Sequence, residues 1–398
     1  MLFQPAAFEQ LTDEAWEEER VRGGIRAIVA DAEERFDPVA LWPAEEWDSW
    51  GSPTPLTGLY CGAAGVVWAL DALRRRGHAD VGIDLAAAAR RALERAREAP
   101  ELSEAEDFEL PRASDAGLFS GETGSLVVAW RVGGDVSLEV PIQERILESR
   151  ESDANEVMWG APGGLLAARA LLDWTGGEPW AEIWQTTADA VWDARDEDGL
   201  WTQRLFGNTG RSLGPAHGLV GIARALLGGG DLLPAARRDR ILTDTVQILE
   251  RNAVYEGKLA NWPPRDGDSL ERPDGEPRLQ WCHGAPGVVT STADFLPEEL
   301  LLPGAELTWR AGPHGPKKGS SICHGTAGNG YAFLKMFERT ADQEWLDRAR
   351  RFAVHALAQV ERRANGHYSL WTGDLGVAIY AADCLDGATR YPVLETWD

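Results

Sequence analysis

Gly284-Ala-Pro-Gly287 and Gly325-Thr-Ala-Gly328 are two copies of a four-residue phrase that occurs seven times in the chain and decides its fold. In every copy two glycines are separated by two residues, and an apolar stretch follows. Some copies are expected by chance among 43 glycines, but seven copies in the same context predict a repeat architecture. The other five begin at Gly62, Gly121, Gly160, Gly218 and Gly373.

The segments after and between these phrases predict two kinds of helix. Residues 66–73 and 165–172 are apolar on nearly every side, which is typical of helices buried within a core. The longer segments 84–99, 180–195 and 343–363 are rich in Ala, Arg and Glu, with charges at helical spacing that suit a solvated layer. Each repeat is therefore expected to supply one inner and one outer helix.

Strand signals are thin. Residues 136–140 and 368–371 are short candidates that also suit loops or small hairpins. Residues 261–277 are rich in Pro, Gly and Asp and predict a long loop, which can cover a site. Because such repeats cannot bury their faces alone, we expect a single all-α domain over residues 1–398.

Composition limits the classes of function. The chain has 398 residues, a formal net charge of −25 and a pI near 4.7, which argues against binding nucleic acid or anionic membranes. Residues 1–22 have no apolar core of a signal peptide, and no run of 18 apolar residues predicts a membrane span. Four scattered cysteines do not suggest a disulfide framework, so we expect a reduced, cytoplasmic protein.

Two repeats carry a Cys-His pair directly before the glycines: Cys282-His283 and Cys323-His324. Equivalent positions of a ring of repeats face the same axis, so these side chains can converge. Two thiolates and one imidazole are usual zinc ligands, and catalytic zinc sites keep a fourth position open. Spacing alone excludes neither histidine. The alternative is that these cysteines are small buried apolar residues, which is favoured for Cys61 and Cys384 because no His follows them.

These motifs resemble the lanthionine synthetase C (LanC) family. The resemblance rests on WCHGAPG at 281–287, CHGTAGNGYAFL at 323–334 and Pro215-Ala-His-Gly218, and the repeats extend it over about residues 51–385. It implies an α/α toroid, a double ring of seven inner and seven outer helices, with residues 1–50 as a helical segment packed on the ring. It also implies a zinc ion whose ligands are Cys282, Cys323 and His324.

The family contains cyclases, which close thioether rings in lanthipeptides, and LanC-like proteins, which bind glutathione and add it to dehydroamino acids. The motif phrasing, Asn261-Trp-Pro and Lys318 resemble the second group. The resemblance further implies that His217 and Arg278 are catalytic, and that Lys318, His283 and Asn261 lie at the substrate. Cyclases carry an Asp four residues before the third glycine phrase. The residue there is Glu156, a third catalytic candidate whose role this departure leaves open.

This chemistry needs a thiolate and a proton for the resulting enolate. A free thiol with a pKa of about 8.5 is mostly protonated at neutral pH, and bound zinc favours its thiolate. His217 suits proton transfer because imidazole titrates near neutrality. Arg278 and Lys318 can pair with a carboxylate or with the enolate, or be ordinary surface charges. Glu156 can orient His217, bind a substrate amine or cap a helix.

Four functions therefore compete. The first is addition of a thiol, with glutathione favoured, to dehydroalanine or dehydrobutyrine residues of a peptide or protein. The second is cyclisation of a dehydrated lanthipeptide precursor, and the third is a non-catalytic zinc- or glutathione-binding scaffold or sensor. The fourth is a glycoside hydrolase, since α/α toroids host such enzymes and 18 Trp residues suit sugar stacking. That reading leaves the matched Cys-His pairs unexplained.

Overall fold

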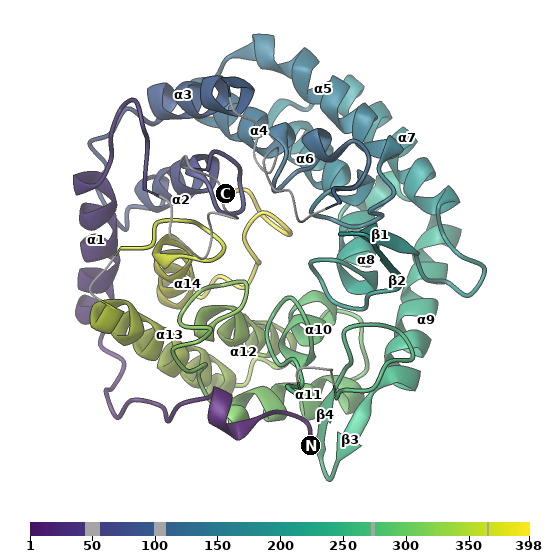
Figure 1. Cartoon of the computed structure of the whole chain (residues 1–398). Helices are drawn as coiled ribbons and strands as arrows, with labels where there is room; N and C mark the ends of the chain where they lie inside the picture. Colours follow the sequence, from purple (N-terminus) through teal and green to yellow (C-terminus); the bar gives the residue numbers. More distant parts are fainter. Residues whose placement is uncertain (44–55, 99–108, 272–274, 364–365) are drawn as a thin grey trace.

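The computed structural model describes residues 1–43, 56–98, 109–271, 275–363 and 366–398. Two concentric layers of α-helices surround a common centre (Figure 1). Within these residues the inner layer has seven helices, and each begins at the residue after the first glycine of one glycine phrase. They are α2 (Ala63–Arg75), α4 (Glu122–Gly133), α6 (Ala161–Thr175), α8 (Leu219–Leu227), α10 (Ala285–Thr292), α12 (Thr326–Thr340) and α14 (Asp374–Asp386).

The outer layer in the same ranges also has seven helices, which alternate with the inner ones along the chain. They are α1 (Glu18–Glu34), α3 (Leu85–Glu98), α5 (Glu139–Glu148), α7 (Glu178–Asp193), α9 (Ala235–Asn252), α11 (Glu298–Ala311) and α13 (Gln343–Arg363). Each inner helix contacts the next inner helix, and α14 contacts α2, so the inner ring closes. The predicted double ring of seven and seven helices is confirmed.

Burial explains the two layers. In α6 nearly every residue from Ala161 to Leu171 is buried, as its apolar sequence predicts. In α3 the buried residues Leu85, Ala88, Ala89, Ala92 and Leu93 form one stripe at helical spacing, and charged residues cover the other face. The inner helices therefore form the core, and the outer helices shield it from solvent.

The second glycine of every phrase has a steric reason. A Cβ atom added at any of these seven positions would lie 1.8 to 2.4 Å from the carbonyl oxygen of the residue six positions earlier. At Gly287, for example, that oxygen belongs to Trp281, and at Gly328 it belongs to Ile322. Only glycine permits this close approach of two backbone segments. The approach folds the turn before each inner helix tightly against the first turn of that helix.

Short strands occur where the sequence did not suggest them. Strands β1 (Gln203–Leu205) and β2 (Asn208–Gly210) form one antiparallel hairpin, and β3 (Val254–Glu256) and β4 (Leu259–Asn261) form another. The two strand candidates differ from the structure, since 136–138 is a 3₁₀ turn that leads into α5 and 368–371 lies in the turn before α14. Residues 262–271 and 275–277 form a loop without helix or strand, as predicted.

The remaining short elements are 3₁₀ turns. Their bounds are Pro5–Ala7, Ser114–Ala116, Val136–Leu138, Ser149–Glu151 and Gly230–Leu232.

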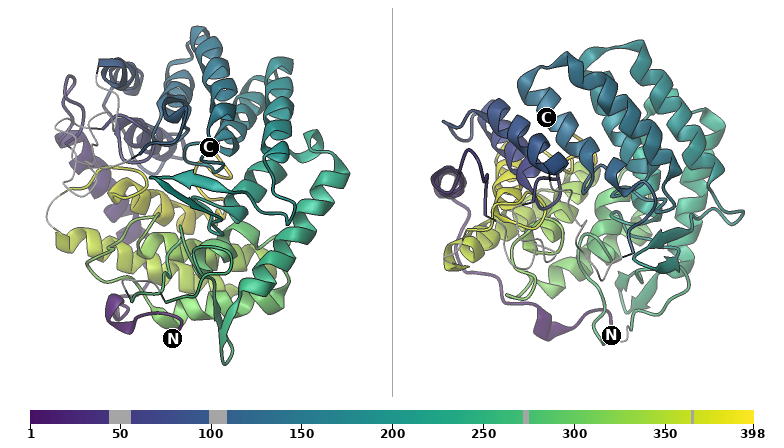
Figure 2. Two further views of the ribbon diagram at one scale, coloured as in Figure 1. Left: turned by 45° about the vertical axis from the view of Figure 1, so that its right-hand side comes forward. Right: turned by 45° about the horizontal axis from the view of Figure 1, so that its top comes forward.

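The two ends of the chain lie in different places. Helix α1 contacts α14 and α13 and completes the outer layer. Residues 44–50 of the predicted N-terminal segment 1–50 lie outside the described residues. The C-terminal segment after α14 turns into the middle of the ring (Figures 1 and 2). There the indole nitrogen of Trp68 in α2 donates to the carbonyl oxygen of Trp397.

No helix in the described ranges is both long and apolar enough to cross a membrane. The assignment of residues 1–398 to one domain stays a prediction.

Candidate metal centre and active site

The site is built from the turns that precede the inner helices. In six of the seven repeats, the second residue before the glycine phrase belongs to a chain of backbone hydrogen bonds that runs from repeat to repeat. In each bond the N–H of one donates to the carbonyl oxygen of the next, with N···O distances of 2.9 to 3.4 Å. The chain of bonds runs Cys282, Cys323, Trp371, Tyr60, Phe119, Met158. This chain explains why equivalent positions of distant repeats meet.

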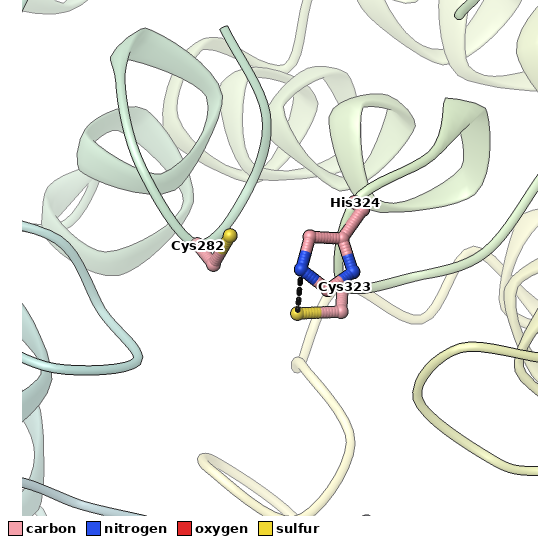
Figure 3. A group of neighbouring side chains, drawn as sticks. All are labelled: Cys282, Cys323 and His324. Carbon is pink, nitrogen blue, oxygen red and sulfur yellow. Dashed lines mark hydrogen bonds between the residues drawn. The ribbon is translucent and has the colours of Figure 1, made fainter. Parts of the chain in front are cut away.

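Cys282, Cys323 and His324 come together at this place (Figure 3). Cys282 comes from the turn before α10, and the other two come from the turn before α12. The two sulfur atoms and the ligand nitrogen all lie within 4.8 Å of one another. Among the described residues, these three side chains form a group that could hold a metal ion. The Cys323 sulfur lies 3.8 Å from Nε2 of His324. Tetrahedral zinc holds a sulfur and a nitrogen about 3.5 Å apart, so the donor set fits zinc in kind and spacing.

The two thiols influence each other's pKa. Burial acts to raise the pKa of Cys282, but the hydrogen bond from Cys323 and the neighbouring imidazoles of His324 and His283 outweigh it and lower that pKa. Burial and the neighbouring Cys282 sulfur raise the pKa of Cys323. The hydrogen bond between the two thiols thus makes Cys282 the more acidic of the pair.

Each cysteine sulfur accepts a hydrogen bond from a buried side chain. The Tyr60 hydroxyl donates to Sγ of Cys323 over 3.0 Å, and the Gln280 amide nitrogen donates to Sγ of Cys282 over 2.8 Å. Burial raises the pKa of Tyr60 well above its ordinary value, so its phenol stays protonated at neutral pH. Neither Tyr60 nor Gln280 was predicted from the sequence as a site residue. Alignment of the seven turns would have found Tyr60, because it occupies the position of the two cysteines in the first repeat.

A cavity of about 280 Å³ opens beside this cluster. Seven of the nine predicted site residues line it, together with Tyr60, Met158, Ala216 and Gln280. The seven are His217, Arg278, Cys282, His283, Lys318, Cys323 and His324. The remaining two, Glu156 and Asn261, lie behind its wall.

Glu156 forms a pair with His217. Its Oε2 atom lies 2.8 Å from Nδ1 of His217, and its two oxygens also accept the backbone N–H groups of Met158 and Trp159. Burial lowers the pKa of His217, but the hydrogen bond and charge of Glu156, with help from Cys282, outweigh burial and raise it. The structure therefore favours the first of the roles left open for Glu156: it orients His217 and leaves Nε2 to exchange a proton with a ligand.

Lys318 and Arg278 are the cations of the cavity. Burial, opposed by the cysteines but reinforced by the charge of Arg278, lowers the pKa of Lys318. The neighbouring Lys317 is exposed and pairs instead with Glu276 at 3.2 Å. The two adjacent lysines thus have different environments, and only Lys318 faces the site.

His283 lines the cavity but is not part of the three-residue ligand cluster. Burial lowers its pKa to about 4, so its imidazole is neutral at pH 7. Its ring centroid lies 6.1 Å from that of His217. This position suits contact with a ligand in the cavity, as the sequence analysis expected.

Asn261 has no surface exposed to the cavity. Its amide nitrogen donates to the carbonyl oxygens of Leu2 and Arg278, and its amide oxygen accepts from the N–H groups of Trp262 and Ala285. These four bonds use the full capacity of the side chain. The resemblance implied that Asn261 contacts the substrate, but this geometry does not support that contact. Asn261 instead holds the backbone at Arg278 and the start of α10.

The two other cysteines are not part of the ligand cluster. Cys384 is buried in α14, and burial raises the pKa of its thiol. Cys61 is half-buried, with its sulfur 3.6 Å from the Thr372 hydroxyl.

The chain is similar to several known proteins. A family model described as "Lanthionine synthetase C-like protein" matches residues 25–396. The Danio rerio protein "Glutathione S-transferase LANCL1" is 30% identical over 196 residues, which are 46% of this chain and 45% of that protein. "LanC-like protein GCL1" of Arabidopsis thaliana is 27% identical over 184 residues, 42% of this chain and 39% of that protein. Both alignments span less than half of these relatives.

The solved structure of "Nisin cyclase" superposes with a TM-score of 0.57 at 14% sequence identity, and covers 92% of this chain and 94% of that one. At this identity the likeness concerns the fold, and it agrees with the predicted toroid.

Proposed function

Because this chain belongs to the lanthionine synthetase C-like family, we propose that it forms carbon–sulfur bonds by adding a thiol to a dehydroalanine or dehydrobutyrine residue. We propose zinc as its cofactor and glutathione as the thiol. The observation that carries the proposal is the meeting, in one cavity, of a Cys₂His cluster, a His–Glu pair and two cations. Each part meets one requirement of the reaction.

Cys282, Cys323 and His324 are the proposed ligands. A zinc ion held by two thiolates and a neutral imidazole supplies a site of zero net charge that favours the thiolate form of a thiol substrate and keeps its sulfur electron-rich.

His217 is the proposed acid and base. Its Nε2 accepts the proton of the substrate thiol, and the sulfur then bonds to the β-carbon of the dehydroamino acid. The electron pair of the C=C bond moves onto the α-carbon and its carbonyl oxygen as an enolate. His217 returns the proton to the α-carbon, so a thiol and an alkene yield one thioether. Glu156 stabilises the imidazolium while it carries the proton.

Arg278 and Lys318 favour glutathione as the thiol because that tripeptide carries two carboxylates and the cavity presents two cations. The printed name of the Danio rerio relative supports the same choice. We further propose that the protein works in the reducing cytoplasm, since all four of its cysteines are free thiols and two of them are needed as ligands.

The test is incubation of zinc-loaded protein with glutathione and a dehydroalanine peptide, followed by mass spectrometry. We expect a product heavier by one glutathione, which His217→Asn abolishes and His78→Asn, a replacement far from the cavity, retains. Absence of the adduct with zinc fully bound would refute the proposed addition. In that case a ring product from a dehydrated Cys-containing peptide would identify a cyclase, and no product would leave a binding role.

A further inference from the structure

Two buried donors reach the two sulfurs of the ligand cluster, one each. The Tyr60 hydroxyl lies 3.0 Å from Sγ of Cys323, and the Gln280 amide nitrogen lies 2.8 Å from Sγ of Cys282. The donors come from different parts of the chain: Tyr60 precedes α2, and Gln280 lies in the turn before α10. Tyr60 is 9% exposed and Gln280 is 4% exposed, so both donors are shielded from solvent.

A site of this composition has a problem of selectivity. Once a thiol substrate enters, three sulfurs lie close to an electrophile, and only one of them is meant to react. Alkylation of Cys282 or Cys323 would destroy the ligand set. Burial alone does not prevent this, because both sulfurs border the cavity that receives the electrophile.

Hydrogen bonding distinguishes the sulfurs. A thiolate that accepts a hydrogen bond shares its negative charge with the donor and is a weaker nucleophile than one that accepts none. We infer that Tyr60 and Gln280 are positioning residues that lower the nucleophilicity of Cys323 and Cys282 and so reserve reactivity for the sulfur of the substrate. The inference rests on the proposed function, because it presumes that the two thiolates bind a metal ion.

The backbone holds both donors in place. The Tyr60 N–H donates to the Phe119 carbonyl oxygen over 2.9 Å, and the Tyr60 carbonyl oxygen accepts from Trp371. The Gln280 N–H donates to the carbonyl oxygen of His283 over 3.0 Å, and that residue's N–H donates back over 3.0 Å. The small turn closed by this second pair fixes Gln280 directly beside Cys282.

Tyr60→Phe and Gln280→Leu test the inference, since each removes one donor and keeps the bulk of the side chain. Tyr380→Phe is the matched control, because it removes a buried hydroxyl that donates to the Ala349 carbonyl oxygen, away from the site. Each protein is loaded with Co²⁺, and its sulfur-to-cobalt charge-transfer absorption is recorded. We expect the band to move to longer wavelength in Tyr60→Phe and Gln280→Leu and to stay in place in Tyr380→Phe, because a sulfur without its hydrogen bond gives up charge more easily.

The second measurement is alkylation by iodoacetamide, located by peptide mass spectrometry. Tyr60→Phe is expected to speed modification of Cys323 about tenfold, and Gln280→Leu that of Cys282, which is the scale of one lost hydrogen bond to a charged group. Unchanged bands and rates in both variants would overturn the inference, and so would equal acceleration at both cysteines, which indicates general loosening. A wild-type chain that takes up no Co²⁺ or Zn²⁺ would overturn the metal site first, and this inference with it.

Discussion

Replacement of Glu156 by Gln tests the pairing at the centre of the proposed reaction. The side chain keeps its size but loses the charge that faces Nδ1 of His217 at 2.8 Å. A hydrogen bond to a charged group contributes about 1.5–3 kcal/mol, which predicts a fall in kcat/KM of roughly one to two orders of magnitude. Glu122→Gln is the control, since Glu122 is partly buried and pairs with arginines outside the cavity.

The same variant has a direct effect on titration. Burial lowers the pKa of His217, and the Glu156 carboxylate reverses that effect. Without this charge, burial is expected to prevail and the pKa of His217 to fall, which an NMR titration of its imidazole measures. An unchanged or raised pKa in Glu156→Gln would refute the reasoning, as would full kcat/KM.

The raised pKa of His217 also sets how the stability of the folded protein depends on pH. The wild-type pKa of His217 is raised in the folded state, so its contribution to stability is fully present below the unfolded pKa of about 6.5 and is lost as the pH rises through the folded pKa. In Glu156→Gln a lowered pKa reverses this dependence. The difference in free energy of unfolding between wild type and variant should therefore be larger at pH 6 than at pH 8.

Three further changes have expected outcomes. Gly328→Ala places a Cβ 1.9 Å from the carbonyl oxygen of Ile322 and should lower the free energy of unfolding by about 2–4 kcal/mol. Gly23→Ala is the control and should not lower it, because no atom lies within 4 Å of the added Cβ. Equal urea midpoints for the two variants would contradict this prediction. Lys318→Met should raise the KM for glutathione about tenfold, whereas Lys317→Met should leave it unchanged. Equal effects of the two substitutions on KM would show that Lys318 does not bind glutathione. Tyr391→Phe should make zinc easier to remove with a chelator without loss of folding, because the Tyr391 hydroxyl holds the backbone at Ile322, next to Cys323. Zinc retention equal to that of the wild type would contradict this role.

The repeat determined how much of the fold was predictable. Glycine phrases mark a steric requirement that only glycine meets, so every inner helix could be located from residues such as Gly287. The hairpins β1–β2 and β3–β4 were not predicted, because their three-residue strands leave too short a pattern to recognise. The strand candidate at 136–140 was wrong for the same reason: its two β-branched residues, Val136 and Val140, also fit the start of a helix.

Some residues of the candidate site were predictable from the sequence, and others were not. Cys282 and Cys323 were predictable because the same motif precedes α10 and α12, and equivalent turns meet through backbone hydrogen bonds. The contact between Glu156 and His217 joins residues 61 positions apart and has no local signature. Gln280 is a polar residue without a motif, and only the fold shows that its amide reaches a sulfur.

Tyr391 shows most clearly what the sequence could not reveal. It comes from the C-terminal segment that enters the ring, stacks on Trp281 with ring centroids 4.6 Å apart, and donates to the Ile322 carbonyl oxygen over 2.6 Å. It therefore contacts the residue before each ligand cysteine. Nothing in the local sequence predicts that the end of the chain supports the turns that carry the proposed metal ligands.

The central claim is that Cys282, Cys323 and His324 bind one zinc ion. Elemental analysis of the purified protein, made beside Cys323→Ser and the control Cys384→Ser, tests it most directly. We expect about one zinc per chain in the wild type and in Cys384→Ser, whose cysteine lies buried in α14 outside the cluster, and loss of zinc in Cys323→Ser. Full zinc content in Cys323→Ser, or none in the wild type refolded with excess zinc, would contradict it.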